Sequence, residues 1–258
     1  DSTVTAITPP TCFGATNGLI EVNVANGTAP YRYNWEDGQG FVDAASLTNL
    51  GANAYAVQVV DANGCEGDFQ FVMEQPTALT VTLEAINASC SGLDDGVVTA
   101  TVGGGTGDYT YQWNTNPVQT TPTAIGLKAR DYIVIVTDVN GCVEEDTITV
   151  TEASQIIPNV AASNISCFGL CDGDATTTPA GGTAPYSISW DMIPSGAGFP
   201  TATNPINGLC DGTYFVTVTD DSLCVVTDTV EIFEPAEIFL SLRGCHFYRD
   251  EIYSQVFG

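Results

Sequence analysis

Basic residues are nearly absent from this 258-residue chain, which has five Lys plus Arg against 31 Asp plus Glu and a formal net charge of −26. Its one lysine is Lys128. Nucleic acids and anionic membrane surfaces attract basic patches, so this balance argues against both as partners. The strong like charge instead predicts a soluble protein whose copies repel one another.

Histidine and long apolar runs are scarce as well. The one histidine, His246, lies in a stretch without the signature of a Ser-His-Asp triad, which argues against that kind of hydrolysis. No apolar run approaches the roughly 18 residues that a membrane span needs. The chain begins at Asp1 with neither Met nor a signal peptide, so we expect a processed chain or an interior fragment.

Hydrophobic residues make up 44% of the chain, which is enough to build packed cores, so the acidity does not indicate disorder. Thr, Val, Gly and Asn are abundant, and they suit β-strands and turns better than helices. Nine cysteines at recurring positions in small β-rich units predict an oxidising, extracytoplasmic setting.

One eleven-residue stretch occurs three times, at residues 55–65, 132–142 and 214–224. Its first half alternates as a half-buried strand does, and the Tyr, Val and Val of one face are the same in every copy while the other face changes. We therefore expect this fixed face, which is Tyr132, Val134 and Val136 in the second copy, to lie against the core. The Asp-x-Asn-Gly that follows in the first two copies is typical of a tight hairpin turn before the cysteine.

Two further landmarks recur at one period. Successive cysteines stand 78, 77 and 78 residues apart at Cys12, Cys90, Cys167 and Cys245, and successive tryptophans stand 78 and 77 apart at Trp35, Trp113 and Trp190. A period this long indicates an array of whole small domains. We predict repeats at residues 1–76, 77–154 and 155–235, followed by residues 236–258 as the start of a truncated fourth repeat or an atypical tail.

Each predicted repeat holds six or seven short antiparallel strands in about 77 residues, which is the size and rhythm of an immunoglobulin-like sandwich. The predicted fold class is therefore all-β, with tandem immunoglobulin-like β-sandwich domains. The joints between them are short and carry charge or proline, as in Glu74-Gln-Pro and Glu234-Pro, which predicts a semi-rigid, elongated string.

The cysteines predict disulfide bonds. One pair recurs in every repeat, so we expect bridges within repeats, namely Cys12–Cys65, Cys90–Cys142 and Cys167–Cys224. Cys171 and Cys210 occur together in the third repeat and have no counterparts in the others, which predicts a second bridge there. Closing loops of this size restricts the unfolded chain and is worth roughly 4 kcal/mol each.

The third repeat leaves an alternative open. Cys210 and Cys224 flank one strand and so lie at opposite ends of it, whereas Cys167 and Cys171 are at most about 13 Å apart along the chain. Either one of these four cysteines lies within a strand, or the pairing differs from the expected one. The rival arrangement is a zinc site with four cysteine ligands, although the ligand spacing is untypical.

Three aspartates, Asp61, Asp138 and Asp220, recur at the end of the repeated strand. Calcium takes hard oxygen ligands, so these carboxylates are weak calcium candidates. The alternative is Asx-turn chemistry, in which a carboxylate accepts hydrogen bonds from nearby backbone N–H groups. The sequence has no EF-hand spacing, so we favour the turn and predict no cofactor.

The other candidate sites are better explained by structural roles than by ligand binding or catalysis. The run Gly103-Gly-Gly-Thr-Gly lacks the Lys-Ser/Thr and the helix of a phosphate loop, so we predict a hairpin turn. The three tryptophans could be exposed platforms for sugars, but a sandwich keeps its core tryptophan on this strand. Paired acids could serve glycoside hydrolysis, yet carboxylates that recur in every repeat look architectural, and we predict no enzyme.

Taken together, these landmarks resemble the SprB-type repeat of very large Bacteroidetes cell-surface adhesins. The shared pattern is Cys-x-Gly, then Asn/Asp-Gly and a strand, then Gly-Gly-Thr-x-Pro-Tyr-x-x-x-Trp, a strand that ends Asp-x-Asn-Gly-Cys, and a closing Glu-x-Pro. It extends from residue 1 to about 240. Departures such as Ser91 for Phe and Ser222-Leu223 for Asn-Gly leave the core face unchanged.

The resemblance implies export by the type IX secretion system, display on the cell surface and, in gliding members, movement by a motility machine. It carries no catalytic residues. We predict a non-catalytic stalk that holds an adhesive region away from the cell and meets external surfaces or polysaccharide through other parts of the chain. The alternatives are an extracellular polysaccharide-binding module and the accessory domains of a secreted enzyme.

Overall fold

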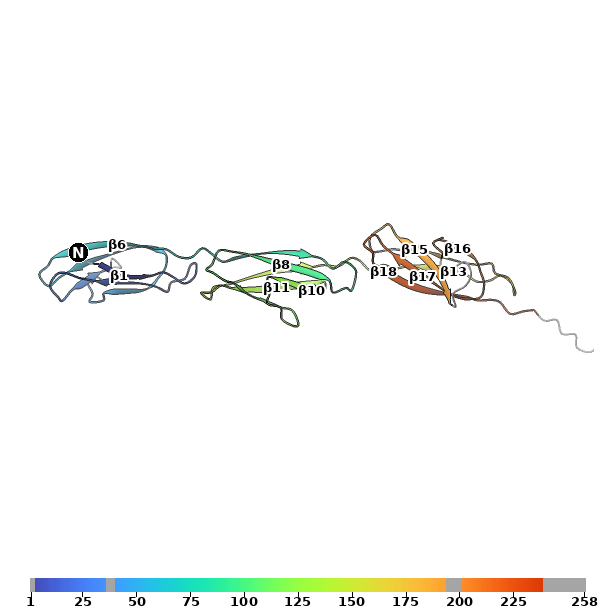
Figure 1. The fold of residues 1–258 in the computed structure, drawn as a ribbon, viewed down its shortest axis with the longest axis horizontal. Coiled ribbons are helices and arrows are strands. Elements are labelled where there is room, and N and C mark those ends of the chain that lie inside the picture. The colour runs from blue at the N-terminus through green and yellow to red at the C-terminus, as the bar shows by residue number, and fades with distance from the viewer. Residues whose placement is uncertain (1–2, 36–39, 194–200, 239–258) are drawn as a thin grey trace, which may run out of the picture. The chain divides into compact units, whose positions relative to one another are not determined.

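The computed structural model describes residues 3–35, 40–193 and 201–238, and the regular elements in these ranges are β-strands (Figure 1). The chain divides into two compact units, residues 1–153 and 154–258. Most of the predicted fourth repeat or tail, including Cys245 and His246, lies outside the described residues.

The first unit contains two sandwiches and the second unit contains one. The strands of the first sandwich are β1 (Thr3–Thr8), β2 (Gly18–Asn23), β3 (Arg32–Asn34), β4 (Ser46–Leu50), β5 (Asn53–Val60) and β6 (Glu66–Met73). Those of the second are β7 (Thr80–Ile86), β8 (Gly96–Gly103), β9 (Thr110–Trp113), β10 (Thr123–Leu127), β11 (Arg130–Thr137) and β12 (Val143–Val150). Those of the third are β13 (Val160–Ser163), β14 (Gly173–Thr177), β15 (Ser187–Ile193), β16 (Ile206–Leu209), β17 (Gly212–Thr219) and β18 (Val225–Ile232).

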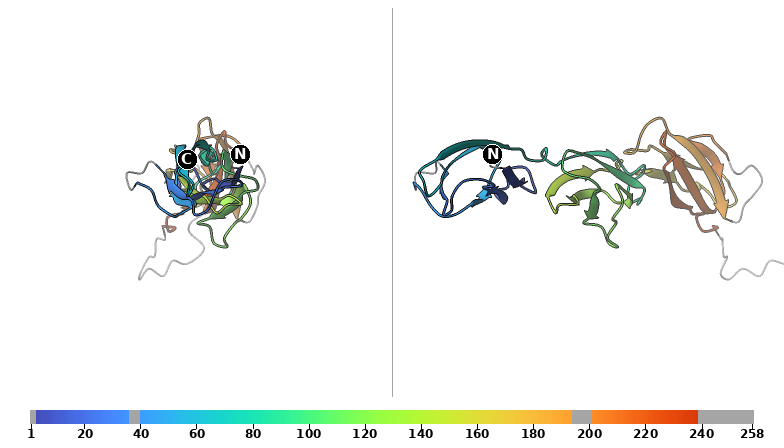
Figure 2. Two further views of the ribbon diagram at one scale, coloured as in Figure 1. Left: turned by 90° about the vertical axis from the view of Figure 1, so that its left-hand side faces the viewer. Right: turned by 60° about the vertical axis from the view of Figure 1, so that its left-hand side comes forward.

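Figures 1 and 2 show strands in stacked layers within each sandwich, and all three sandwiches share one sheet topology. In the first, one sheet has the order β1-β2-β4, the other has the order β3-β5-β6, and the paired strands are antiparallel. The same order recurs as β7-β8-β10 with β9-β11-β12, and as β13-β14-β16 with β15-β17-β18. It corresponds to the A-B-E and C-F-G sheets of a constant-type immunoglobulin domain without strand D.

A tyrosine hydrogen bond marks the same fold in every sandwich. The hydroxyl of the first residue in the repeated stretch donates to the backbone carbonyl four residues earlier: Tyr55 to Gly51 (3.0 Å), Tyr132 to Lys128 (3.1 Å) and Tyr214 to Cys210 (3.1 Å). Immunoglobulin-like domains have this tyrosine corner where their strands E and F meet. The corner and the sheet topology confirm the predicted all-β, immunoglobulin-like fold.

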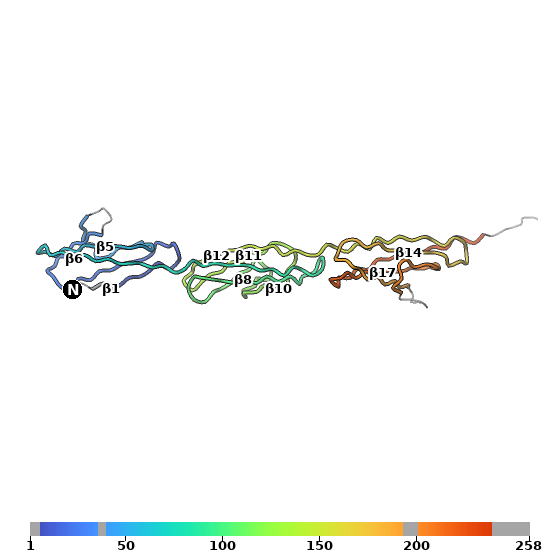
Figure 3. The backbone as a smooth tube through the Cα atoms, turned by 90° about the horizontal axis from the view of Figure 1, so that it is seen from above, coloured from blue at the N-terminus to red at the C-terminus, as the bar shows by residue number. Residues whose placement is uncertain are grey.

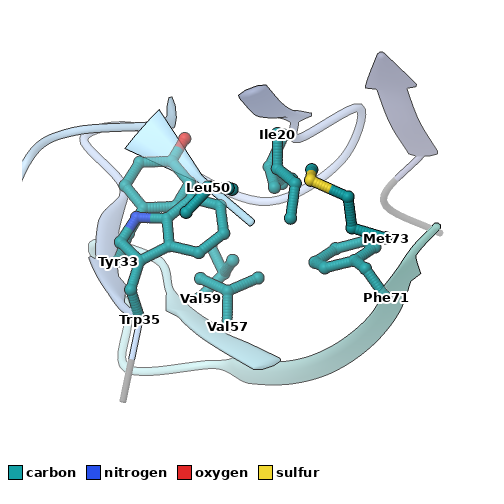
Figure 4. Close-up of a cluster of buried hydrophobic side chains, with 9 residues drawn as sticks. Ile20, Tyr33, Trp35, Leu50, Val57, Val59, Phe71 and Met73 are labelled. Carbon is teal, nitrogen blue, oxygen red and sulfur yellow. The ribbon is translucent and has the colours of Figure 1, made fainter. Parts of the chain in front are cut away.

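The core of each sandwich lies between its two sheets. In the first sandwich, side chains from both sheets pack together (Figure 4), namely Ile20, Val22, Tyr33, Trp35, Leu50, Val57, Val59, Phe71 and Met73. The second core is Val98, Ala100, Trp113, Ala124, Leu127, Tyr132, Val134, Val136 and Val150. Contact between the sheets removes these apolar surfaces from water, which is the main stabilising contribution in a domain of this size.

The repeated strand has the predicted core face. In β11, Tyr132, Val134 and Val136 are buried, and the residues between them are partly exposed. The equivalent residues of β17 are buried in the same way, and β5 differs in that Tyr55 is partly buried. Side chains alternate between the two faces of a strand, so a fixed set at every second position identifies the buried face.

The loop between β8 and β9 contains a glycine that no other residue could replace without a shift. Gly104 has φ of 69°, and a Cβ there would lie 1.9 Å from the carbonyl oxygen of Ala78. Next to it, Gly105 donates its backbone N–H to Thr77 (3.0 Å). The glycine run is therefore a turn that holds the segment leading into β7, but the predicted hairpin is wrong, because β8 and β9 lie in different sheets and do not pair.

Candidate functional site

Two cysteine-bearing segments recur in the sandwiches. We call residues 61–65, 138–142 and 220–224 the cysteine turns, because each closes the hairpin between the last two strands of a sandwich. We call residues 11–17, 89–95 and 166–172 the cysteine loops, because each joins the first two strands.

The backbone of the cysteine turns is a tight hairpin. The N–H of Asp138 donates to the carbonyl of Cys142 (3.0 Å), and the N–H of Gly141 donates to the carbonyl of Asp138 (3.0 Å). Gly141 has φ of 81°, in the left-handed region that favours glycine. In the third turn Leu223 takes this conformation with φ of 66°, which is uncommon for a side chain of this size.

The aspartate of each turn accepts hydrogen bonds through both carboxylate oxygens. Asp138 Oδ1 accepts the backbone N–H groups of Asn140 and Cys142, each at 2.9 Å. Its Oδ2 accepts the N–H of Thr106 at 2.9 Å, from the loop between β8 and β9. One carboxylate therefore orders the cysteine turn and fastens it to the neighbouring loop.

The other two sandwiches repeat this arrangement. Asp61 accepts the N–H groups of Asn63, Cys65 and Thr28, and Asp220 accepts those of Cys224 and Thr183, at 2.8–3.0 Å. The Asx-turn interpretation therefore describes all three aspartates. The structure does not bring the three weak calcium candidates together, because each lies in a different sandwich.

Backbone donors change the acidity of two of these aspartates. The N–H of Thr28, followed by that of Cys65, holds the pKa of Asp61 below its usual value. For Asp138, burial is the largest influence and opposes the charge, yet the N–H groups of Cys142, Thr106, Asn140 and Gly141 together lower its pKa. Among the described residues, no group of three or more His, Cys, Asp and Glu side chains is arranged to hold a metal ion.

The cysteine loops are held by their own hydrogen bonds, which the sequence analysis missed. The residue before each cysteine donates its backbone N–H to an Asn or Asp six residues later: Thr11 to Asn17 (3.1 Å), Ser89 to Asp95 (3.0 Å) and Ser166 to Asp172 (2.9 Å). The Ser89 hydroxyl, followed by its N–H, lowers the pKa of Asp95, and Ser166 does the same for Asp172.

A second bond fastens each cysteine loop to the end of its own sandwich. A left-handed glycine donates its N–H to a Gln or Glu just after the last strand: Gly14 to Gln75 (2.7 Å), Gly92 to Glu152 (2.7 Å) and Gly169 to Glu234 (2.6 Å). The sequence signal was present in the Ser/Thr-Cys-x-Gly-x-x-Asn/Asp spacing and in the closing Gln/Glu of each repeat.

The disulfide that joins a cysteine loop to a cysteine turn is not the predicted one. Cys12 of the first cysteine loop is bonded to Cys142 of the second cysteine turn, with Cα atoms 5.7 Å apart. Beside it, the Asn140 side-chain amide donates to the carbonyl of Thr11 at 3.3 Å. The predicted pairs Cys12–Cys65 and Cys90–Cys142 are therefore wrong, because the bridge connects two sandwiches.

The length of one strand explains this correction. The first cysteine loop leads into Gly18, which pairs with Leu50, and Leu50 lies just before the start of β5. Cys65 follows the far end of β5, which runs beside β6 in the hairpin of Figure 3. A strand of eight residues spans about 26 Å, whereas the Cα atoms of a disulfide lie within about 7 Å. The loop and turn of one sandwich thus lie at its opposite ends.

The remaining cysteines complete the correction. Cys65 and Cys167 are free and exposed, so the predicted Cys167–Cys224 bridge is wrong too, while Cys90 and Cys224 are disulfide-bonded. The predicted Cys171–Cys210 bridge is present, with Cα atoms 4.1 Å apart. These two residues come from a loop and a corner at the same end of the third sandwich. Because their sulfurs are bonded to each other, the alternative of a four-cysteine zinc site is overturned.

The tryptophans belong to the core. Trp113 and Trp190 are at most 1% exposed and Trp35 is 5% exposed. The indole N–H of Trp35 donates to Ala44 and that of Trp113 to Thr121, both at 2.9 Å. Buried indoles present no face to a sugar, so the tryptophans are not binding platforms.

Comparison with known families finds one family that matches three times, once in each sandwich. The family described as SprB repeat matches residues 4–40, 82–118 and 159–193, which span the first three strands and the cysteine loop of each sandwich. Each of the three sandwiches therefore contains a SprB-type repeat. No curated protein matches it. SprB repeats with immunoglobulin-like folds fit an extracellular, adhesin-type repeat region.

Several solved structures are similar to the SprB repeats of this chain. Titin domains I67–I69, in an E-to-A variant, cover 92% of this chain and 98% of their own at 14% identity, with a TM-score of 0.42. Extracellular domains 3–5 of Drosophila OTK cover 92% and 98% at 10% identity, with a TM-score of 0.29. A structure on Dscam isoform specificity covers 91% and 74% at 11% identity, with a TM-score of 0.26. TM-scores this low do not establish a shared fold, so the fold assignment rests on the strand topology.

The disulfides of the SprB repeats suit an oxidising, extracellular setting. Within the described residues there is no helix long and apolar enough to cross a membrane.

Proposed function

We propose that this chain is a non-catalytic stalk segment of a very large cell-surface adhesin, which holds an adhesive region away from the cell. In this proposal the chain is exported by the type IX secretion system and serves surface attachment and gliding motility. Its partners are the secretion and motility machinery, and external surfaces or polysaccharide are contacted through other parts of the protein.

The Cys12–Cys142 bridge is the observation that carries the proposal. It joins two successive SprB repeats by a covalent bond outside the backbone. Tension along the chain would reach Cys12 through the backbone and cross to Cys142, so the residues between them would bear none of it. A disulfide in this position suits a protein segment that must transmit tension without extending.

The length that the bridge protects is large. Cys12 and Cys142 are 130 residues apart in sequence. Fully extended chain measures at most about 3.3–3.6 Å per residue, so the bridge withholds roughly 450 Å of contour length. The Cys171–Cys210 bridge, with a separation of 39 residues, withholds roughly 130 Å in the third repeat in the same way.

The repeated carboxylates support a structural role. In each sandwich the aspartate of the cysteine turn is taken up by backbone N–H groups, so the proposal assigns it to holding the turn and assigns no calcium or other cofactor. The polysaccharide-binding alternative would be favoured by exposed aromatic side chains aligned on one face. The tryptophans do not support it, because they are buried. No observation favours the accessory domains of an enzyme.

Single-molecule pulling tests the load-bearing role. The whole chain is held by handles at Asp1 and Ala153, so that the measured length belongs to the first unit. Under oxidising conditions the Cys12→Ser variant should extend by about 450 Å more than the wild type, and reductant should abolish the difference. The Cys65→Ser variant should behave as wild type. Equal extension of wild type and Cys12→Ser would contradict the proposal.

Surface display has a separate test. Antibodies raised against the folded chain should label intact cells of the organism that produces it. Labelling that appears only after the cells are permeabilised would contradict the proposed location.

A further inference from the structure

Basic side chains gather at one place in this acidic chain. Within the described residues the Lys and Arg residues are Arg32, Lys128 and Arg130, against a formal net charge of −26 for the whole chain. Lys128 and Arg130 line one groove of the second sandwich, which has a volume of about 470 Å³. Sites for small ligands commonly measure about 300–1,000 Å³, so this groove is large enough for one.

The groove is built around the tyrosine corner of the second sandwich. Its walls are the loop between β9 and β10, part of β10, the corner between β10 and β11, and Asp94 of the second cysteine loop. All of these segments belong to the first unit. The positions of Lys128 and Arg130 are uncharged in the other two sandwiches, where they hold Gly51 and Asn53, and Cys210 and Gly212. The pair of cations is therefore a feature of the second repeat.

Arg130 is held in place by two contacts. Its Nη2 donates to the Asn114 carbonyl at 3.1 Å, and its guanidinium carbon lies 4.5 Å from the centre of the Tyr132 ring. A guanidinium carries five N–H donors in a planar fork, so most of them remain for an acceptor. The fork matches the two oxygens of a carboxylate, and here it is positioned before any ligand arrives.

Lys128 supplies the second positive charge. Its Nζ lies 3.5 Å from Asp94 Oδ2, and the two side chains are 71% and 50% exposed. An ion pair this exposed contributes little free energy, so a ligand can take the place of Asp94 at low cost. Among the described residues that line the groove, Asp94 is the one acidic residue, which leaves an excess of positive charge there.

Gln119 fixes the loop that forms one wall. Its side-chain amide donates to the Ile125 carbonyl and accepts from the Ile125 N–H, both at 2.9 Å. Its backbone N–H donates to the Thr115 hydroxyl at 2.9 Å. These bonds order the loop without a ligand. They also occupy both backbone groups of Ile125 on β10, an edge strand of its sheet, so an extended peptide cannot pair with β10 at this point.

The rest of the lining suits a sugar ring. Asn116 is exposed in the wall of the groove, and its amide offers donors and an acceptor to hydroxyl groups. Pro117 and the 62% exposed Ile125 offer apolar surface to the C–H groups of the ring. A small number of polar groups on an apolar lining is the usual composition of a small-ligand site.

We propose that this groove binds an acidic sugar residue of the uronate kind, with its carboxylate held by Arg130 and Lys128 and its hydroxyls by Asn116. The two cations select an anion, the planar fork favours a carboxylate, and the blocked edge of β10 disfavours a peptide. The site adds a contact within the segment itself to those made through other parts of the protein. It does not depend on the stalk role.

Calorimetric titration of the full chain, with its disulfides intact, tests the proposal. The buffer contains 0.15 M salt, where the Debye length is about 8 Å, so distant carboxylates of the chain are screened while direct contacts persist. The probes are short oligomers of glucuronate, galacturonate and mannuronate. At least one should bind at one site per chain. Its methyl ester keeps the rings and loses the charge, so it should bind about tenfold more weakly or worse.

Variants of the two arginines locate the site. Arg130→Gln should weaken binding about tenfold or more, because it removes hydrogen bonds from a charged donor. Arg130→Lys keeps the charge without the fork and should restore only part of the affinity. Arg32→Gln is the matched control, since Arg32 also donates to a backbone carbonyl, that of Phe41 at 3.1 Å, and lies over its ring but outside the groove. It should bind as wild type.

Asp94→Asn gives a change of opposite sign. It removes the carboxylate that competes for Lys128, so binding of the uronate should become several-fold tighter. A merely structural ion pair predicts no such gain. The melting temperature of each variant without ligand shows that it is folded.

Three results would overturn the proposal. The first is that none of the uronate oligomers binds, and the second is that Arg130→Gln binds as tightly as wild type. The third is that acetate or oligoglutamate binds as tightly as the best uronate, which would show attraction of carboxylates in general and no recognition of a sugar. Loss of the stalk role in the pulling experiment would leave these results unaffected.

Discussion

Cys12, in the first cysteine loop, is bonded to Cys142, in the second cysteine turn, across the border between two SprB repeats. The loop and turn of one sandwich lie at opposite ends of it, so a loop can reach only the turn of a neighbour. The two cysteines that recur in every repeat thus serve here to link the first repeat to the second.

Removing the bridge should destabilise the first unit. In the chain-entropy model, closing a loop of 130 residues is worth roughly 5 kcal/mol. Cys12→Ser, Cys142→Ser and the double variant should each lower the melting temperature by roughly 10 °C or more in calorimetry without reductant. The three variants should agree with one another, because any one of them removes the whole bond.

Cys65→Ser is the matched control, since it changes a cysteine of the equivalent turn that is free and exposed. Its melting temperature should equal that of the wild type. A loss at Cys65→Ser as large as that at Cys12→Ser would contradict the bridge between repeats.

Acid should remove the contribution of Asp61. The pKa of Asp61 is lowered in the folded state by backbone donors, first Thr28 and then Cys65, from an ordinary value of 3.8. A lowered folded pKa gives stability that is present above the unfolded pKa and is lost as pH falls through the folded pKa. Asp61→Asn should therefore melt below wild type near neutral pH, and the gap should close as pH falls below 3.8.

Asp68 is an exposed aspartate of the same sandwich, on β6, and it supplies the control. Asp68→Asn should leave the melting temperature nearly unchanged at every pH. A gap between wild type and Asp61→Asn that stays constant from neutral pH to pH 2 would contradict the proposed role of the charged carboxylate.

Calcium should have no specific effect on stability. The oxygens of Asp61, Asp138 and Asp220 already accept backbone N–H groups, which a calcium ion would have to displace. Calorimetry with chelator, with millimolar calcium and with equal magnesium should give the same melting temperature. Stabilisation by calcium beyond that by magnesium would count against the Asx-turn assignment.

The tyrosine corner should contribute measurably. Tyr132→Phe removes the hydroxyl that donates to the Lys128 carbonyl at 3.1 Å, and the ring remains in the core. Loss of one such hydrogen bond costs about 1 kcal/mol, or roughly 4–8 °C for a domain of this size. Tyr111→Phe, on the partly buried ring of β9, is the control and should melt within a degree or so of wild type. Equal effects of the two changes would show that the corner contributes nothing.

Much of the fold was predictable because three copies of one unit appear in the same chain. The unchanged Tyr and Val positions of β11 identified the core face without any structure, since a strand exposes alternate residues to its two sides. The burial of the tryptophan of β9 followed from its place on a strand in the middle of the repeat sequence. Turn chemistry identified the role of Asp138, because an aspartate before Asn-Gly commonly bonds the backbone two residues on.

The disulfide partners were not predictable from recurrence. A cysteine pair that appears in every repeat looks the same whether the two bond to each other or to the neighbouring repeats. The deciding quantity is the length of β5, because Cys12 lies near the start of this strand and Cys65 follows its far end. The awkward placement of Cys210 and Cys224 at the two ends of β17 was a sign of this in the sequence itself.

Disulfide mapping tests the central claim most directly. Without reduction, free thiols are first alkylated, and the chain is then cut after Lys, Arg and Glu. Cys12, Cys65, Cys90 and Cys142 then lie on separate peptides, namely residues 1–21, 37–66, 85–128 and 131–144. The structure predicts that mass spectrometry finds peptide 1–21 linked to 131–144 and finds Cys65 alkylated. Peptide 1–21 linked to 37–66, with 85–128 linked to 131–144, would contradict it.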